Sequence, residues 1–61
     1  MKVKQIFVCE NYTIGETEKL INSVLSVYPQ EDVISVRFSG CWDEGANATV
    51  YRGEVLYLED K

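Results

Sequence analysis

Residues 13–28, with the sequence TIGETEKLINSVLSVY, decide the fold because they alone carry the periodicity of a helix. Mostly apolar side chains recur there at spacings of three, four and one, which places them on one helical face. That face comprises Ile14, Thr17, Leu20, Ile21, Val24, Leu25 and Tyr28. Thr13 and Glu16 match a capping box, and Pro29 disfavours helical geometry in the residue before it. The segment therefore predicts an amphipathic helix of about four turns.

The segments on either side of this helix have the character of β-strands. Residues 2–9 are short and rich in β-forming side chains, and residues 33–39 alternate between apolar and polar side chains. Residues 40–47 contain two glycines and two acids and predict a loop. Residues 48–58 form a longer β run with broken alternation, and a bulge is expected at Gly53.

The element order β-α-β-β predicts an α+β fold, in which a three-stranded mixed sheet carries one helix on one face. Residues 1–61 are too few for more than a single domain. The first two strands are expected to run parallel, because a helix connects them, and the last two to form an antiparallel hairpin. The third strand fits either the centre or an edge, and its length favours the centre.

The residue types present restrict the chemistry severely. The chain has no histidine, which removes Ser-His-Asp and Cys-His catalysis. Any other general base would be a carboxylate or a lysine with a strongly shifted pKa, which requires a water-excluded cleft. A chain of 61 residues has little room for such a cleft. We therefore predict that the protein is not an enzyme and that it holds no metal or other cofactor.

The charge and the N-terminal segment restrict partners and location. Ten acidic and six basic side chains give a net charge of −4, which disfavours nucleic acid and anionic membranes as partners and suits a basic protein. The apolar run at residues 6–9 is too short for a signal peptide, and no segment approaches the length of a membrane span. We expect a cytoplasmic protein.

The two cysteines, Cys9 and Cys41, are expected to remain thiols in a reducing compartment. Both lie near the carboxyl ends of predicted strands that run in the same direction. The sequence therefore leaves two interpretations open. The cysteines are either two small half-buried side chains, or two neighbouring thiols that oxidation can link.

A single helix covers only one face of the predicted sheet, and the other face is expected to be apolar. Both parities of the third strand carry large apolar or aromatic residues, and so does the first strand. Such a face usually marks a protein contact, and a second copy related by a two-fold axis is the simplest occupant. We assign Phe7, Tyr51 and Tyr57 to this contact. The alternative is that the tyrosines lie at the sheet margin with their hydroxyls in water.

The predicted loop is a second candidate contact. Its Trp42, Asp43 and Glu44 combine the only tryptophan of the chain with two acids, which suits a basic protein partner. Glu10 is expected at the same end of the sheet. The alternative is that Trp42 folds back over the edge of the core and the acids are simply solvated.

Two arginines form a third candidate site. Arg37 and Arg52 lie on the second and third predicted strands and share a face if those strands are neighbours. They are then placed to bind an anionic ligand at a subunit interface. The alternative is ordinary cross-strand pairing with Glu54 or Glu44.

Three segments resemble a known family. They are Met1-Lys2-Val3-Lys4 at the start, Asp32-Val33-Ile34-Ser35-Val36-Arg37-Phe38-Ser39 after the helix, and Tyr51-Arg52-Gly53-Glu54-Val55-Leu56-Tyr57 near the end. In order and landmarks the chain resembles the small Bacillus-type sporulation-associated proteins. The resemblance implies a small bacterial or bacteriophage accessory protein; the family has no established enzymatic activity to carry over, and the resemblance implies no site residues.

These observations together predict a small non-enzymatic interaction module that self-associates through the uncovered sheet face. Two alternatives remain open. One is an acidic phage-type inhibitor that occupies a basic site of a host protein. The other is a small anionic-ligand binder with its site between subunits.

Overall fold

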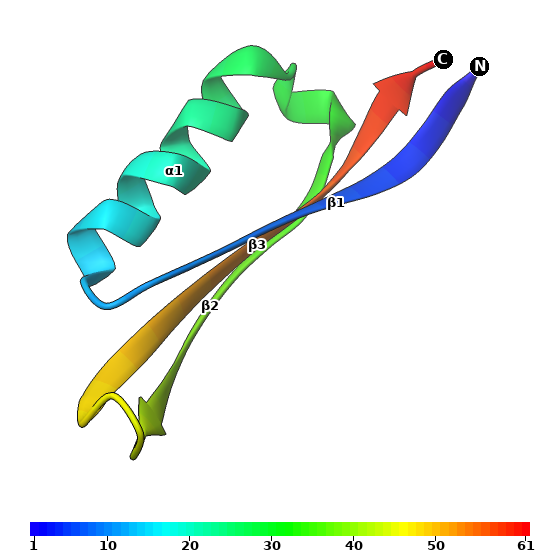
Figure 1. Ribbon diagram of the computed structural model, residues 1–61. Coiled ribbons are helices and arrows are strands. Elements are labelled where there is room, and N and C mark those ends of the chain that lie inside the picture. The colour runs from blue at the N-terminus through cyan, green and yellow to red at the C-terminus, as the bar shows by residue number, and fades with distance from the viewer.

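A computed structural model describes residues 1–61 and confirms the α+β fold (Figure 1). The elements are β1 (Lys2–Asn11), α1 (Ile14–Val27), the 3-10 helix η1 (Gln30–Asp32), β2 (Val33–Asp43) and β3 (Ala48–Asp60). The helix lies along one side of the sheet, and the hairpin between β2 and β3 extends beyond the start of the helix (Figure 1).

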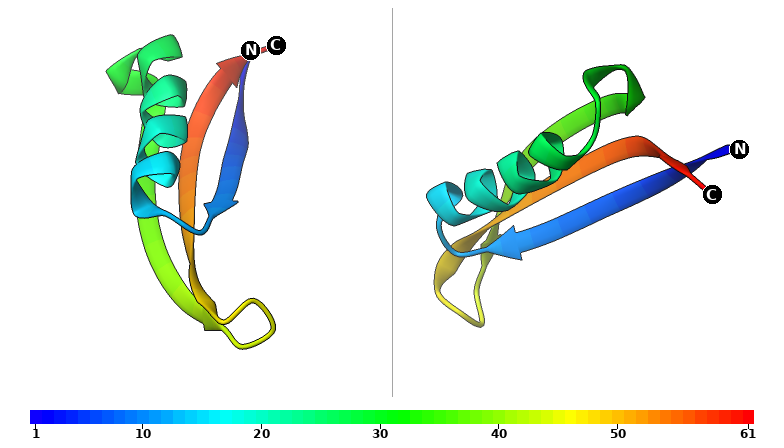
Figure 2. Two further views of the ribbon diagram at one scale, coloured as in Figure 1. Left: turned by 60° about the vertical axis from the view of Figure 1, so that its left-hand side comes forward. Right: turned by 90° about the horizontal axis from the view of Figure 1, so that it is seen from above.

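The strand order is β1-β3-β2, which confirms the central position favoured for the third strand (Figure 2). Both β1 and β2 pair antiparallel with β3. The prediction of a mixed sheet is therefore wrong. The two parallel strands are separated by β3, so every neighbouring pair is antiparallel.

The strands are longer than the sequence predicted. β1 continues to Asn11, and β2 continues to Asp43 where a loop was expected from Gly40. The reason is that β3 continues opposite this segment, with Gly40 paired to Tyr51 and Trp42 paired to Thr49. The connection between β2 and β3 is consequently a short turn over residues 44–47.

The helix begins and ends as predicted, with a different cap. The Thr13 hydroxyl accepts a hydrogen bond from the backbone N–H of Glu16 at 3.4 Å. The backbone N–H of Thr13 donates to Asn11 Oδ1 at 3.3 Å, so Asn11 takes the part expected of the Glu16 carboxylate. Glu16 instead lies 3.8 Å from Lys19 Nζ.

The core is small and lies between α1 and the sheet. Its buried hydrophobic residues are Cys9, Ile21 and Val55, from β1, α1 and β3. Thr17 is also fully buried, and its hydroxyl lies 3.3 Å from both the Thr13 and the Tyr51 carbonyl oxygens. This hydroxyl therefore links the first turn of the helix to the central strand.

The close approach of the helix explains why position 53 is a glycine, and the bulge that was expected there is absent. The register of β3 is regular at Gly53, and the only shift lies between Val33 and Ser35 of β2. A Cβ atom on Gly53 would lie 2.7 Å from Ile21 Cγ1 and 3.0 Å from Thr17 Cγ2. Only glycine permits this approach of α1 to β3.

A second link joins β1 to η1. Lys2 Nζ lies 2.6 and 2.7 Å from the two carboxylate oxygens of Asp32, which is buried. This hydrogen-bonded ion pair, opposed by partial desolvation, raises the pKa of Lys2 above its ordinary value of 10.5. The pair connects the start of the chain to the segment that leads into β2.

We expect Gly53→Ala to lower the free energy of unfolding by about 1–3 kcal/mol, because the added methyl group overpacks the contact with Ile21. Urea denaturation measures this change. Gly15→Ala is the control, because a Cβ there has no neighbouring atom within 4 Å. Equal losses in the two variants would contradict the close-approach explanation.

The Lys2–Asp32 pair predicts a loss of stability in alkali. The folded pKa of Lys2 is raised, so its contribution is complete below pH 10.5 and disappears as the pH rises through the folded pKa. We expect Lys2→Met to be less stable than wild type at pH 8, and the difference to shrink above pH 10.5. Denaturant titrations across this range measure it. Lys4→Met is the control, since Lys4 makes no ion pair, and an equal pH-dependent difference in both variants argues against the assignment.

Candidate interaction surface

The helix side of β2 carries apolar side chains that the helix leaves uncovered. The register places Val36, Phe38, Gly40 and Trp42 on the same side of the sheet as α1, opposite Val55, Gly53, Tyr51 and Thr49 of β3. We call these four β2 residues the β2 strip. Phe38 is 51% exposed and Trp42 is 56% exposed, although the alternation of residues 33–39 predicts a buried face. The core draws on β2 only at Val33.

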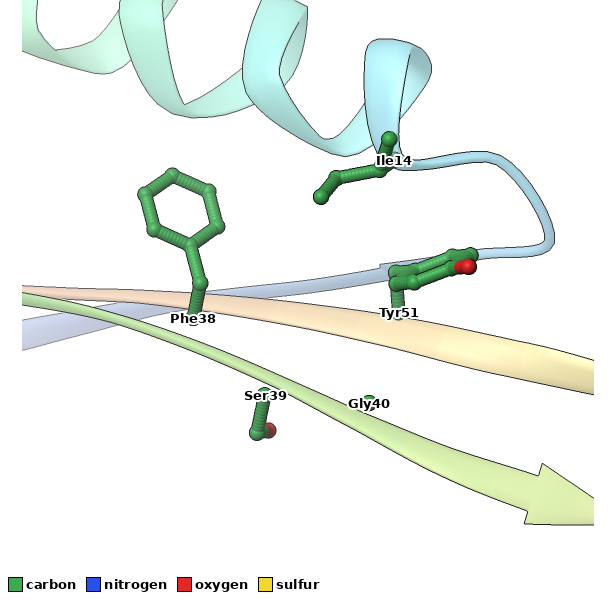
Figure 3. A pocket seen from close by; sticks show the side chains of 5 residues that line it. All are labelled: Ile14, Phe38, Ser39, Gly40 and Tyr51. Atoms are coloured by element: carbon green, nitrogen blue, oxygen red, sulfur yellow. The ribbon is translucent and has the colours of Figure 1, made fainter.

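A cavity opens between this strip and the start of the helix. It has a volume of about 240 Å³ and is lined by Ile14, Phe38, Ser39, Gly40 and Tyr51. Figure 3 shows Ile14, Phe38 and Tyr51 on the helix side of the sheet and Ser39 on the opposite side. The volume is below the roughly 300–1,000 Å³ of typical small-molecule sites, so the cavity suits a single side chain better than a ligand.

The residues predicted for self-association do not lie on the uncovered face. Phe7 and Tyr57 pack against the core beneath the helix, and Tyr51 lines the cavity on the helix side. The prediction of their position is wrong because the helix packs on Gly53 and Val55, and the register places Phe7 opposite Val55 on that same side. Because β3 has no bulge at Gly53, its odd-numbered residues lie on the helix side of the sheet along the whole strand.

Tyr57 has a further contact on the helix side. Its ring centroid lies 4.4 Å from that of Tyr28, which follows the helix. The adjacent Tyr57 hydroxyl, followed by desolvation and the charge of Glu59, raises the pKa of Tyr28. Tyr57 is thus part of the packing that holds the end of α1 on the sheet, and a lysine there would disturb the fold itself.

The face without a helix is apolar only in part. Ile6 and Leu56 lie opposite each other there, as do Val8 and Glu54. Arg52 Nε lies 2.8 Å from Glu54 Oε1, so an ion pair occupies the middle of this face. The register also places Glu10 of β1 opposite Arg52, and it places Arg37 of β2 opposite Glu54. A row of four charged side chains therefore crosses the face from edge to edge.

The two arginines share this face, as expected for neighbouring strands. Arg52 is occupied by Glu54, whereas Arg37 forms no ion pair within the chain. Neither arginine lines a cavity. Nothing in the geometry forms a pocket for an anionic ligand here, and that function stays a prediction.

The predicted partner-binding residues are divided between a strand and a turn. Trp42 and Asp43 end β2, and only Glu44 lies in the turn. Trp42 is exposed and does not fold over the core. Asp43 Oδ1 accepts hydrogen bonds from the backbone N–H groups of Gly45 at 3.0 Å and Ala46 at 3.4 Å, so this carboxylate shapes the turn.

Glu10 reaches the same end of the sheet, as the sequence predicted. Glu10 and Asp43 both line a shallow hollow, together with Asn11, Tyr12 and Val50. This hollow brings together acidic side chains from two strands. Even so, no group of three or more potential metal ligands is placed to hold an ion.

The two cysteines lie on opposite faces of the sheet. Cys9 is buried opposite Gly53 on the helix side, whereas Cys41 is exposed opposite Val50 on the other side. Both are free thiols. The interpretation that they are neighbours is wrong, because parallel strands align their ends but residue parity decides the face.

Comparisons with known proteins identified no similar protein. No family model, curated protein sequence or solved structure matches the chain. The fourteen residues of α1 do not meet the length and apolarity that a membrane-crossing helix requires.

We expect the two thiols to react at different rates with a disulfide reagent such as Ellman's. Cys41 is exposed and should be modified quickly, whereas buried Cys9 should react only when the protein unfolds. The absorbance time course measures both rates, with and without denaturant. Cys41→Ser should abolish the fast phase alone, and two equal rates in the native wild type would contradict the assignment of faces.

Proposed function

We propose that this protein is a non-enzymatic interaction module that self-associates through the β2 strip and the unpaired edge of β2. One observation carries the proposal. A single chain buries three hydrophobic residues, whereas eleven large hydrophobic side chains are exposed. Two of the most exposed aromatic side chains, Phe38 and Trp42, lie on the same face of β2, with Gly40 between them.

The small core supports the need for a second subunit. A domain of this size buries only about 60% of the surface that its unfolded chain exposes. Small domains usually add disulfides, a metal or another subunit. Both cysteines are free, and no cluster of metal ligands is formed. Association is the remaining route by which the exposed apolar surface can contribute to stability.

The charges favour β2 over the face without a helix. Packing two such faces together would bury the row of Glu10, Arg52, Glu54 and Arg37. Desolvating charged side chains costs free energy that their mutual attraction often fails to recover. An interface at the edge of β2 leaves this row at the surface and covers the β2 strip instead.

We further propose a bacterial or phage origin and a cytoplasmic location for the protein. The resemblance to small Bacillus-type sporulation-associated proteins, carried by residues 1–4, 32–39 and 51–57, agrees with an accessory protein of bacterial or phage type. A cytoplasmic location is supported by the free thiol of Cys41, since an exposed unpaired cysteine suits a reducing compartment.

A second candidate function is supported by the hollow that Glu10 and Asp43 share. Two carboxylates from different strands, with Glu44 in the adjoining turn, present acidic groups to a basic protein. Binding of this kind would weaken with rising salt, unlike association through apolar side chains.

Light scattering behind a sizing column tests the first proposal. We expect wild type to show twice the 7.0 kDa mass of one chain at micromolar concentration. Phe38→Lys should raise the dissociation constant about tenfold or more, because aromatic anchors dominate interface energies. Val27→Lys is the control, because Val27 is 72% exposed on the helix and lies outside the β2 strip. A monomeric wild type would overturn self-association.

A further inference from the structure

The end of β2 has a sequence that is complementary to itself. Residues 37–43 read RFSGCWD, with Gly40 at the centre. Going outward from Gly40, the chain has small residues, then aromatic residues, then opposite charges. The three pairs are Ser39 with Cys41, Phe38 with Trp42, and Arg37 with Asp43. A strand that pairs antiparallel with its own copy places residues at equal distance from the centre opposite each other.

The geometry points to a dimer in which β2 pairs antiparallel with β2 of a second copy, about a two-fold axis through Gly40. This inference rests on the proposed self-association and specifies its register. The two sheets join edge to edge into one continuous sheet with both helices on the same side. Each Arg37 then lies opposite Asp43 of the other copy, and each Phe38 lies opposite Trp42.

The edge of β2 is free for such pairing. β2 bonds only to β3, and its register is regular from Ser35 to Asp43. Exposed edges are usually protected by lysine, proline or bulges. The segment from Ser35 to Asp43 has none of these, and its two charged residues are those that the pairing uses.

The charged residues at the two ends of the segment lack full partners within one chain. The Glu54 carboxylate opposite Arg37 is held by Arg52 at 2.8 Å, which leaves Arg37 without an ion pair. Asp43 uses Oδ1 for the turn, and its Oδ2 accepts no hydrogen bond. Both side chains lie on the same sheet face, so the dimer brings opposite charges together twice.

The aromatic residues meet on the other face. Phe38 and Trp42 are both more than half exposed on the helix side of β2. Cross-strand aromatic pairs stabilise antiparallel sheets beyond their buried area. The cavity of about 240 Å³ lies between Phe38 and Tyr51 (Figure 3), next to Gly40 at the two-fold axis. The missing side chain of Gly40 leaves room for Trp42 of the second copy beside this cavity.

Other registers lose these matches. A shift of one residue would pair side chains from opposite faces of the sheet, so the nearest alternative registers are those shifted by two residues. A two-fold axis through Ser39 places Arg37 opposite Cys41 and Phe38 opposite Gly40. An axis through Cys41 places Asp43 opposite Ser39. Only the axis through Gly40 forms both the charged and the aromatic pairs.

The other edge strand is less suited to the same role. In β1, Lys2 is already held by Asp32 at 2.6 Å, and Phe7 and Cys9 pack against the core. An antiparallel β1 pair centred on Phe7 would match Lys4 with Glu10, so this edge serves as the comparison in the test.

Charge reversal tests the register in solution. Arg37→Asp places two acids opposite each other, and Asp43→Arg places two bases opposite each other, twice in each homodimer. We expect each variant to raise the dissociation constant about tenfold or more, because like charges directly opposite destabilise a strand pair. Mixed in equal amounts, the two variants should form a heterodimer with both charge pairs restored. Sedimentation equilibrium and native mass spectrometry measure these species.

Two further variants complete the experiment. Asp43→Asn keeps a side-chain oxygen for the turn and removes only the charge, so it should weaken the dimer even if Asp43→Arg misfolds. Lys4→Asp makes the same kind of charge change on β1 and should leave the dimer intact. A wild-type dimer that Arg37→Asp does not weaken overturns this register and leaves self-association standing. Disruption by Lys4→Asp assigns the interface to β1, and a monomeric wild type overturns both proposals.

Discussion

The contact between α1 and β3 at Gly53 is the constraint on which the rest of the structure depends. Ile21 and Thr17 occupy the space that a side chain at position 53 would take. This contact determines which parity of β3 faces the helix, and through the register it determines the face of every residue in β1 and β2. The small core and the position of each exposed side chain follow from it.

The same contact explains why apolar side chains remain outside. The buried core forms where α1 meets β1 and β3, and from β2 it draws on Val33 alone. Phe38 and Trp42 lie on the correct side of the sheet for burial and are still exposed. An edge strand with exposed aromatic side chains and backbone groups that no strand of the same chain pairs with suits the strand pairing that we propose.

Charges decide between the surfaces that remain. The face without a helix has apolar residues at Ile6 and Val8, yet a row of four charged side chains crosses it. Within that row Arg52 and Glu54 satisfy each other, and Arg37 is left at the edge. The charge without a partner, Arg37, and the exposed aromatic residues thus occur on the same strand, and the proposed pairing of β2 with a second copy uses both of its faces.

The sequence by itself determined the helix, the element order and most of each strand, because helical and strand periodicities are local properties. It also predicted that Arg37 and Arg52 share a face if their strands are neighbours, and that Glu10 lies at the same end of the sheet as residues 42–44; the register and the shared hollow agree with both. Only the tertiary structure decided which face the helix covers, since a glycine predicts a bulge and a close contact equally well. That choice put Phe7 and Tyr57 beneath the helix, put Tyr51 in the cavity on the helix side and left Phe38 exposed. It also separated Cys9 from Cys41, because facing is a property of the whole sheet and not of any one strand.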